Sequence, residues 1–196
     1  MRLTKIYTKV GDGGQTLLAN GQKIAKDDLR IDAYGTIDEL NSHIGLLRDL
    51  IQSESQENSA GLDRSLYRIQ NELFDLGSEL ATPADALSPR QILISANDIS
   101  QLESEIDNWN ESLSPLKNFV LPGGHLANSQ AHVCRTVCRR AERLLVSLRR
   151  QDPSVRKETQ IYVNRLSDWL FVCGRTVSRL FDRREVLWDQ GRHERK

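Results

Sequence analysis

Apolar residues recur at steps of three and four along most of this chain, the spacing typical of amphipathic helices. The pattern predicts five helices, over about residues 29–52, 62–80, 98–113, 126–150 and 152–185. Asp98 or Ser100 can cap the third helix, and Asp152 followed by Pro153 predicts the start of the fifth. The polar stretch 53–60 is expected to connect the first two helices. Long amphipathic helices with few alternating apolar runs indicate an all-α bundle.

Residues 1–28 differ from the rest because they hold four glycines and show no helical period. We expect a loop-rich segment there, with at most a short extended stretch at residues 5–8. No internal repeat or long linker divides the chain, so we expect a single domain over residues 1–196. In it, the helical bundle covers residues 29–186 and residues 187–196 form a flexible tail.

The composition is that of a folded protein: the 196 residues carry no formal net charge, and 38% are hydrophobic. The chain has no run of about 18 apolar residues that would span a membrane. Its first residues lack the apolar stretch of a signal peptide. Three cysteines are too few, and odd in number, for a disulfide framework. We therefore expect a cytoplasmic protein in a reducing compartment.

The charges are unevenly distributed along the chain. Residues 1–134 hold 11 basic and 19 acidic residues, whereas residues 135–196 hold 16 basic and 8 acidic ones. A basic C-terminal third suggests a polyanionic partner, either a nucleic acid or a phosphate-rich small molecule. Solvated helix faces would explain the same charges, and composition leaves both interpretations open.

The first candidate site is the stretch TKVGDGGQT at residues 8–16. Glycines let backbone N–H groups approach an anion, and Lys9 adds a positive charge, so phosphate binding is one interpretation. No Gly-Lys-Ser/Thr follows at the required spacing, so the stretch is not a Walker A loop. An ordinary flexible loop is the other interpretation.

The second candidate lies on the predicted fourth helix, where Arg135, Arg139 and Arg143 are four residues apart, with Arg140 and Glu142 beside them. Residues at this spacing share one helix face. Such closely spaced arginines repel one another unless carboxylates or an anion compensate them, and their fork geometry suits phosphate oxygens. A solvated face with Glu142 as the intrahelical partner remains the alternative.

Two further polar groups lie within predicted helices. Asn164 and Asp168 share a face of the fifth helix, and polar residues of this size inside a helix call for a tertiary partner or a ligand. Asp38 and Glu39, with Asn41, lie on the first helix, where a carboxylate can pair with an arginine of another subunit or simply face solvent.

A metal centre is not indicated. Cys134, Cys138 and Cys173 lie on apolar stripes, which favours a packing role. No histidine has a glutamate three residues before it, which excludes the Glu-x-x-His pairs of di-iron bundles. We also find no Ser/His/Asp or Cys/His arrangement.

Several stretches occur together in a characteristic order. They are IYTK at 6–9 with GDGGQT at 11–16, KDD at 26–28, AYGTIDELN at 33–41, FVLPGG at 119–124, the arginine stretch 135–143 and NRLSD at 164–168. In this order, over residues 6–179, they resemble the PduO-type ATP:cob(I)alamin adenosyltransferases.

That resemblance implies a five-helix bundle with a ferritin-like up-and-down arrangement, assembled as a homotrimer with active sites between subunits. It implies transfer of the 5′-deoxyadenosyl group of ATP to the cobalt of cob(I)alamin, with release of triphosphate and with Mg²⁺ on the ATP phosphates. A cobalamin reductase and an adenosylcobalamin-dependent enzyme become possible partners, whereas no nucleic acid or membrane partner is implied. Residues 1–28 would then be the nucleotide-binding segment.

The resemblance also implies roles for individual residues. Asp38 would pair with Arg135 of a neighbouring subunit, and Phe119 would pack where the lower axial ligand of cobalamin lies. Asp38, Phe119, Arg135 and Arg139 are thus the candidate catalytic residues. The candidate ATP-binding residues are Thr8, Lys9, Val10, Gly11, Thr16, Lys26, Arg139, Arg140, Glu142, Arg143 and Asn164.

Two positions depart from the family pattern. His125 stands where Ser or Thr is usual, which puts the corrinoid side in question, and Val10 stands where a polar residue is frequent. Co(I) is itself a strong nucleophile, so the absence of a recognisable general base fits this chemistry. The alternatives are a phosphotransferase that uses the same loop and a helical nucleic-acid-binding module that uses the basic C-terminal third.

Overall fold

The computed structural model describes residues 7, 9, 11–54, 56–116 and 118–189. In this part of the chain, five long helices form the molecule: α1 (Leu29–Glu54), α2 (Gln56–Leu80), α3 (Ala96–Asn110), α4 (Leu126–Gln151) and α5 (Lys157–Leu180). A single 3₁₀ turn, Ala84–Ala86, lies between α2 and α3. The prediction of an all-α bundle is therefore confirmed.

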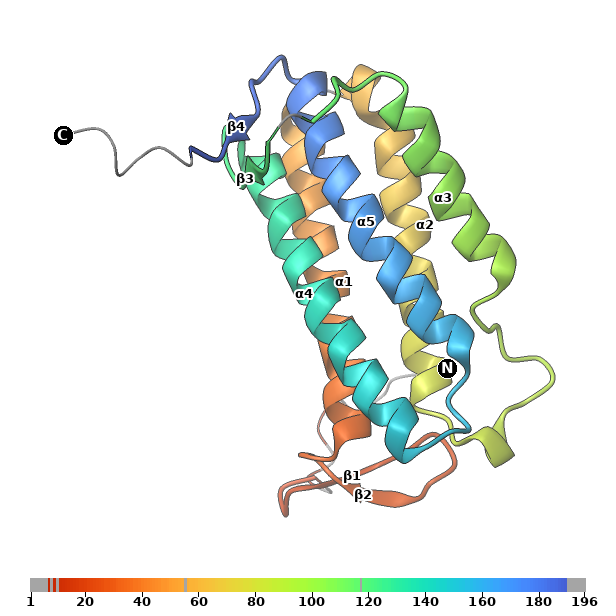
Figure 1. Cartoon of the computed structure of the whole chain (residues 1–196). Helices are drawn as coiled ribbons and strands as arrows, with labels where there is room; N and C mark the ends of the chain where they lie inside the picture. The colour runs from red at the N-terminus through yellow and green to blue at the C-terminus, as the bar shows by residue number, and fades with distance from the viewer. Residues whose placement is uncertain (1–6, 8, 10, 55, 117, 190–196) are drawn as a thin grey trace.

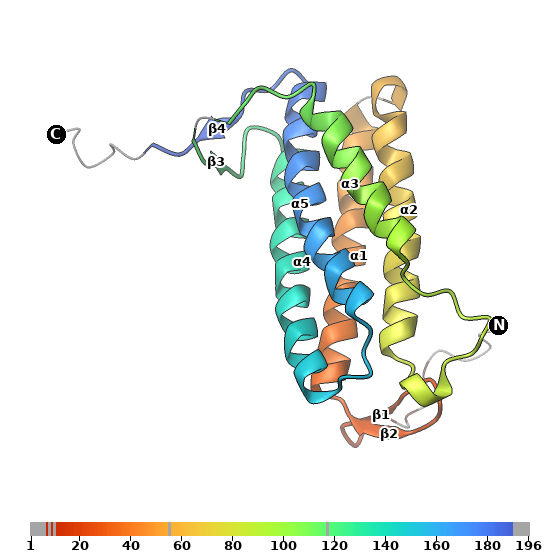
Figure 2. The same ribbon diagram turned by 45° about the vertical axis from the view of Figure 1, so that its right-hand side comes forward.

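The helices pack in the order α2, α1, α4, α5, α3, as Figures 1 and 2 show. Each turns an apolar stripe inward, and the two largest fully buried side chains are Trp169 and Tyr162 on α5. Burying stripes of this kind supplies most of the stability of such helices, because isolated helices are marginal in water. No helix of the described residues is long and apolar enough to cross a membrane.

Two small antiparallel two-stranded sheets close opposite ends of the bundle (Figure 1). At one end, β1 (Gln15–Leu17) pairs with β2 (Lys23–Ala25). At the other end, β3 (Val120–Leu121) pairs with β4 (Val186–Leu187). The sequence pattern predicted neither strand pair. The expected tail 187–196 is wrong at its start, because Leu187 belongs to β4. The short extended stretch expected at residues 5–8 falls mostly outside the described residues.

The expected connection at residues 53–60 is also wrong. The first helix continues to Glu54 and the second begins at Gln56. Burial explains why the helices extend into a polar stretch: Ile51, Ser59 and Leu62 are all buried against the bundle. Tertiary packing thus keeps the ends of both helices in place although their composition is that of a loop.

The fifth helix begins at Lys157 and not at the predicted residue 152. Asp152 ends α4, and its carboxylate accepts a hydrogen bond from the Ser154 backbone N–H at 3.0 Å. Arg30, at the start of α1, forms an ion pair with the same carboxylate. Asp152 is therefore held in a turn instead of capping α5. At its far end, α5 stops at Leu180, and Asp182 adopts a left-handed backbone conformation that no helix continues through.

The third helix begins at Ala96 with Ser95 as its N-cap. The Asp98 carboxylate accepts hydrogen bonds from the backbone N–H and the hydroxyl of Ser95, at 2.8 and 2.7 Å. Asp98 thus belongs to the first turn and completes a capping box, and neither Asp98 nor Ser100 is the cap.

Candidate functional site

The arginine row of α4 is exposed over its central part. Arg139, Arg140 and Arg143 are exposed, and Arg135 is half-buried. Arg143 donates a hydrogen bond to the Arg139 carbonyl at 3.0 Å. Among the described residues, the Arg139 guanidinium has no hydrogen-bond or ion-pair partner, so it is available for an anion.

Two of the predicted ATP-binding residues meet across the groove between α4 and α5. The Asn164 side-chain amide donates to the Glu142 carboxylate at 2.8 Å. The arginine row lies on the same helix, with Arg139 three residues before Glu142 and Arg143 directly after it. Asn164, in the middle of α5, thus has a tertiary partner on α4, which is one of the two alternatives that its position left open. The other polar residue of this face, Asp168, pairs instead with Arg165 on its own helix.

Arg140 points the other way, toward α1. Its guanidinium pairs with the Glu39 carboxylate, and Glu39 also lies 4.0 Å from the His43 ring. Arg140 therefore holds α4 against α1 in the isolated chain, and its side chain is less available for a nucleotide than that of Arg139.

Arg135 is held by a buried histidine one turn earlier. Its Nε donates to His132 Nδ1 at 3.2 Å, and the His132 side chain is 3% exposed. Burial, followed by the nearby Arg135 charge, lowers the pKa of His132 to about 4. Burial and then Arg139 lower the pKa of Arg135 itself. His132 is thus neutral near pH 7 and accepts the Arg135 hydrogen bond.

A cavity of about 610 Å³ opens beside Arg135. Helices α4 and α5 supply His132, Arg135 and Phe171, and the segment that leads into β3 supplies the rest of the lining, which consists of Leu116, Asn118, Phe119 and Val120. The Phe119 ring is 72% exposed. Such a cavity, with apolar walls and a few polar groups, suits a large and mostly apolar ligand.

The N-terminal glycine loop lies at the opposite end, next to β1 and β2. The Lys26 side chain lies directly against Gly11: a Cβ added at Gly11 would lie 2.9 Å from Lys26 Nζ. Thr16 is half-buried in β1, and Lys9 is exposed with a left-handed backbone. Thr8 and Val10 lie outside the described residues. The loop therefore brings a lysine to glycine backbone, as expected for an anion site, but no contact joins this group to Arg139 or Arg143 within the described part of the chain.

Asp38 lines a separate groove between α1 and α2. This groove has a volume of about 400 Å³ and is lined also by Gly35, Phe74 and Gly77. Asp38 is exposed, and no described residue pairs with its carboxylate, while Phe74 is 70% exposed. Within one chain, Asp38 and Arg135 are thus not brought together.

His125 has a structural role. Its Nδ1 accepts a hydrogen bond from the Ala127 N–H at 3.1 Å, so it caps α4 as Ser or Thr would. Its ring also stacks on Phe181, with centroids 4.7 Å apart. The departure from the family pattern at this position is therefore compatible with the same helix start.

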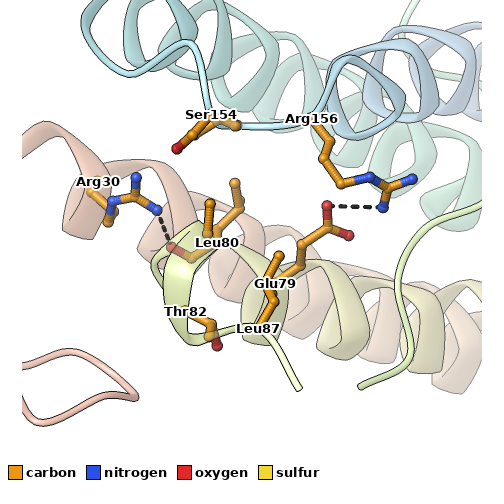
Figure 3. Close-up of a pocket in the computed structure, with 9 residues that line it drawn as sticks. Arg30, Glu79, Leu80, Thr82, Leu87, Ser154 and Arg156 are labelled. Carbon is orange, nitrogen blue, oxygen red and sulfur yellow. Dashed lines mark hydrogen bonds and ion pairs between the residues drawn. The ribbon is translucent and has the colours of Figure 1, made fainter. Parts of the chain in front are cut away.

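A small polar cavity at the end of the bundle that carries β1 and β2 is not a ligand site. Arg30, Glu79 and Arg156 line it, and its volume of about 20 Å³ holds at most one water (Figure 3). Arg30 donates to the Leu80 carbonyl at 2.7 Å, and Arg156 pairs with Glu79 at 3.1 Å. These contacts tie helix ends together.

Four arginines of the basic C-terminal third are compensated by carboxylates of other segments. The pairs are Arg140–Glu39, Arg156–Glu79, Arg165–Glu103 and Arg175–Glu185. A nucleic-acid surface needs a continuous set of free positive charges for phosphate contacts. This pairing disfavours the nucleic-acid alternative.

The described residues contain no group of three or more His, Cys, Asp or Glu side chains that could hold a metal ion. The three cysteines are free and buried, and burial raises the pKa of the Cys134 thiol to about 12. The prediction that these cysteines serve packing is consistent with both observations.

Sequence reasoning missed Phe171 and the place of His132 in the cavity wall. His132 lies three residues before Arg135, and this helical spacing was a usable signal. Phe171 lies on another helix, so no local spacing reports that it shares a cavity with Arg135.

Comparison with known proteins identifies the family. A family model described as cobalamin adenosyltransferase matches residues 6–177. The chain is 44% identical over 191 residues to a cobalamin adenosyltransferase of Cupriavidus metallidurans, and the match covers 97% of each protein. It is 41% identical over 174 residues to a corrinoid adenosyltransferase of Bacillus subtilis, covering 89% of this chain and 86% of the relative.

Solved structures agree with these matches. A variant of the PduO-type ATP:corrinoid adenosyltransferase from Lactobacillus reuteri, complexed with cobalamin and ATP, superimposes with a TM-score of 0.86 at 38% identity. The match covers 95% of this chain and 97% of that one. The arginine row, the glycine loop and the aromatic cavity thus occur in a chain that belongs to the cobalamin adenosyltransferase family.

Proposed function

We propose that this protein transfers the 5′-deoxyadenosyl group of ATP to the cobalt of a reduced corrinoid, forming an adenosylated corrinoid and triphosphate. The observation that carries this proposal is the position of the large cavity of Phe119 and Phe171 directly beside the arginine row of α4. An apolar cavity next to unpaired cations suits a corrinoid that meets the 5′ end of a nucleoside triphosphate. The family membership supports the same reaction.

The reaction needs no protein base. The Co(I) substrate supplies the electron pair for the new cobalt–carbon bond, and the bond between C5′ and the triphosphate oxygen breaks with its electrons going to triphosphate. Negative charge therefore builds on the leaving group. Preorganised cations at that position lower the barrier, and we assign this role to Arg139 and Arg143, with Lys9 and Lys26 from the N-terminal segment.

The remaining candidate residues hold the nucleotide. Asn164 and Glu142, joined at 2.8 Å, form a polar pair beside the arginines that can orient the ribose or the phosphates. Gly11 presents its backbone near Lys26, and we assign Thr16, together with Thr8 and Val10, to the same nucleotide-binding segment. The Arg140 guanidinium is already paired with the Glu39 carboxylate, so we expect Arg140 to act mainly by holding α4 and α1 together.

We further propose a homotrimer in which each active site is built from two subunits. The glycine loop and the arginine row are not in contact in one chain, and neither are Asp38 and Arg135. The α1–α2 groove of Asp38, with its exposed Phe74, offers a surface that a neighbouring α4 can cover. Pairing Asp38 with Arg135 of the neighbour would neutralise both charges and bring the two halves of the site together.

Phe119 would close the corrinoid side. Its exposed ring stands at the wall of the cavity and can exclude water and the lower axial ligand, which makes Co(II) easier to reduce and protects Co(I). Since the described residues offer no acidic cluster for a metal ion, Mg²⁺ would arrive bound to the ATP phosphates and add positive charge there. Free buried cysteines fit a reducing compartment, and we propose a cytoplasmic location.

The test uses the purified full-length protein with ATP, Mg²⁺ and chemically reduced cobalamin. We expect the absorption spectrum to change to that of a cobalt–carbon bond, with one triphosphate released per adenosyl group. Release of ADP or of separate phosphate and pyrophosphate without alkylation would favour a phosphotransferase and contradict the proposal. A sample without ATP controls for spontaneous oxidation of Co(I).

A further inference from the structure

The segment that carries Phe119 is paired with the C-terminal segment of the chain. Val120 and Leu121 form only a two-residue ladder with β4. Next to this ladder, the Trp188 N–H donates to the Phe119 carbonyl at 2.8 Å, and the Asn118 side chain donates to the Trp188 carbonyl at 2.5 Å. The Phe119 and Trp188 rings are 5.8 Å apart. A ladder this short is not stable by itself, so something else must hold the two segments.

Glycine permits the close approach of the two segments. Gly124 has a φ of +82°, and a Cβ there would lie 3.0 Å from the Arg184 carbonyl oxygen. Gly123, with a φ of +145°, passes close to the Val186 side chain. The Pro-Gly-Gly stretch after β3 thus packs against the C-terminal segment. It allows this contact but does not fasten it.

A buried arginine of α5 provides the fastening. Arg175 is 5% exposed. Its Nε donates to Glu185 Oε1 at 2.6 Å and its Nη2 to Glu185 Oε2 at 3.3 Å, a bidentate pair directly before β4. The same Nη2 donates to the Ser114 carbonyl at 2.6 Å, on the segment that leads to Phe119. One guanidinium therefore holds both segments against the end of α5, and charge-assisted forks of this kind are the strong hydrogen bonds of proteins.

The position of this clamp separates the two sides of the proposed site. Four of the seven residues that line the cavity belong to the segment that runs from Ser114 into β3. Asn164, on the nucleotide side, lies 11 residues earlier on α5, about 16 Å along the helix axis. Loss of the clamp should therefore disturb the corrinoid side and leave the nucleotide side in place.

We propose that Arg175 is a positioning residue for the corrinoid side: through Ser114 and Glu185 it fixes Phe119 and Trp188, neither of which it touches. This inference rests on the proposed adenosyl transfer for its kinetic consequence. The clamp itself is a property of the chain without substrates.

The main test compares Arg175→Lys with Arg179→Lys. Lysine keeps the charge but cannot fork to Glu185 and Ser114 together. Arg179 is a matched control, since it lies one turn later, is exposed and donates to Ser112 at 2.7 Å. We expect Arg175→Lys to raise the KM for cob(I)alamin about tenfold or more, with the Kd for ATP changed less than about twofold. A parallel loss of ATP affinity, or the same effect from Arg179→Lys, would overturn the proposal.

A double-mutant cycle shows whether Arg175 acts through Phe119. Phe119→Ala should impair adenosylation with little loss of ATP affinity, and adding Arg175→Lys to it should cost little more. Fully additive effects would mean that Arg175 acts by another route. If Arg175→Lys does not fold, Glu185→Gln serves as the second variant, because it weakens only the C-terminal half of the clamp and should give the same pattern with a smaller change.

Hydrogen exchange without substrates tests the clamp independently of the reaction. Arg175→Lys should speed the exchange of backbone amides in residues 118–121 and 186–188 by about tenfold or more, while amides in the middle of α4 keep their protection. Unchanged exchange would refute the clamp even if the protein is an adenosyltransferase. Faster exchange in a protein that transfers no adenosyl group would leave the clamp intact and refute the proposed function.

Discussion

Arg139 is the residue on which the electrostatic part of the proposal depends most directly. Its guanidinium has no partner among the described residues and stands one turn from both Arg135 and Arg143. Arg139→Ala should therefore lower kcat by about a hundredfold or more, because one such contact supplies about 3 kcal/mol of barrier lowering. The initial rate of adenosylation, measured at saturating ATP and corrinoid, tests this.

Arg150→Ala is the control for that prediction, since Arg150 is an exposed arginine in the last turn of the same helix. It should leave the rate and the oligomeric state as in the parent protein. Near-normal turnover in Arg139→Ala, or an equal loss in Arg150→Ala, would mean that the helix contributes only general positive charge.

His132 makes the stability of the fold depend on pH in a defined direction. Its pKa is about 4 in the folded chain against 6.5 in a model peptide. Below pH 6.5 the unfolded chain therefore binds a proton that the folded chain does not, and the free energy of unfolding decreases as the pH falls from 6.5 to about 4. Below that range both states are protonated, and this contribution no longer changes.

Urea unfolding at a series of pH values tests this in the parent protein and in His132→Asn. Asparagine places an amide oxygen near the position of Nδ1, so it can still accept from Arg135 while carrying no titratable group. The variant should lose part of the decrease between pH 6.5 and 4. An identical slope in both proteins would show that carboxylates alone produce the acid sensitivity.

At the scale of elements, the helices were predictable and the pairs of short strands were not. Local periodicity of apolar residues predicts a helix, and the fourth helix agrees with its prediction to within one residue. The β3–β4 pair joins residues more than sixty positions apart, and each strand has only two residues, so no local pattern reports it. The helix ends at 53–60 and at Asp152 were wrong because burial and the Arg30 ion pair override local composition there.

The same distinction holds for the candidate site. Residue types and spacing pointed to the arginine row and the glycine loop, the resemblance assigned their roles, and geometry then showed which residues meet. Asn164 and Glu142 do so at a distance that their spacing on separate helices could not reveal. The partner that compensates Arg140 was equally hidden, since Glu39 is about a hundred residues away in the chain.

A substitution at Gly124 tests how the β3–β4 pair is held at its end of the bundle. Gly124→Ala adds a Cβ that would lie 3.0 Å from the Arg184 carbonyl, in a left-handed backbone conformation. We expect the free energy of unfolding to fall by about 1–2 kcal/mol. Gly61→Ala is the opposite case, because Gly61 lies in α2 with open space at its Cβ position, and it should stabilise the protein by up to about 1 kcal/mol.

Equilibrium unfolding in urea measures both changes under one set of conditions. If Gly124→Ala is neutral, the C-terminal segment has room to move away from the glycines. The β3–β4 pair would then depend on the Arg175 clamp and on the contacts of Trp188, and not on close packing of the glycines.

At the scale of the whole molecule, the two halves of the proposed nucleotide site lie far apart along one chain. Lys26 directly follows β2 and Arg139 lies midway along α4, and no contact joins the two within the described part of the chain. If neighbouring subunits supply these two residues to one site, variants that are defective in different halves must complement each other. Sedimentation equilibrium should first show a trimer for each variant.

Lys26→Ala and Arg139→Ala should each be nearly inactive when assayed alone. When the two proteins are mixed in equal amounts, unfolded together and refolded, about one quarter of the sites in random trimers combine an intact Lys26 with an intact Arg139. Activity should recover toward about a quarter of the parent value, whereas mixing without subunit exchange should restore nothing. If co-refolded mixtures stay as inactive as the separate variants, each site is built within a single chain. The glycine loop would then have to reach the arginine row of its own subunit, and the intersubunit arrangement would be wrong.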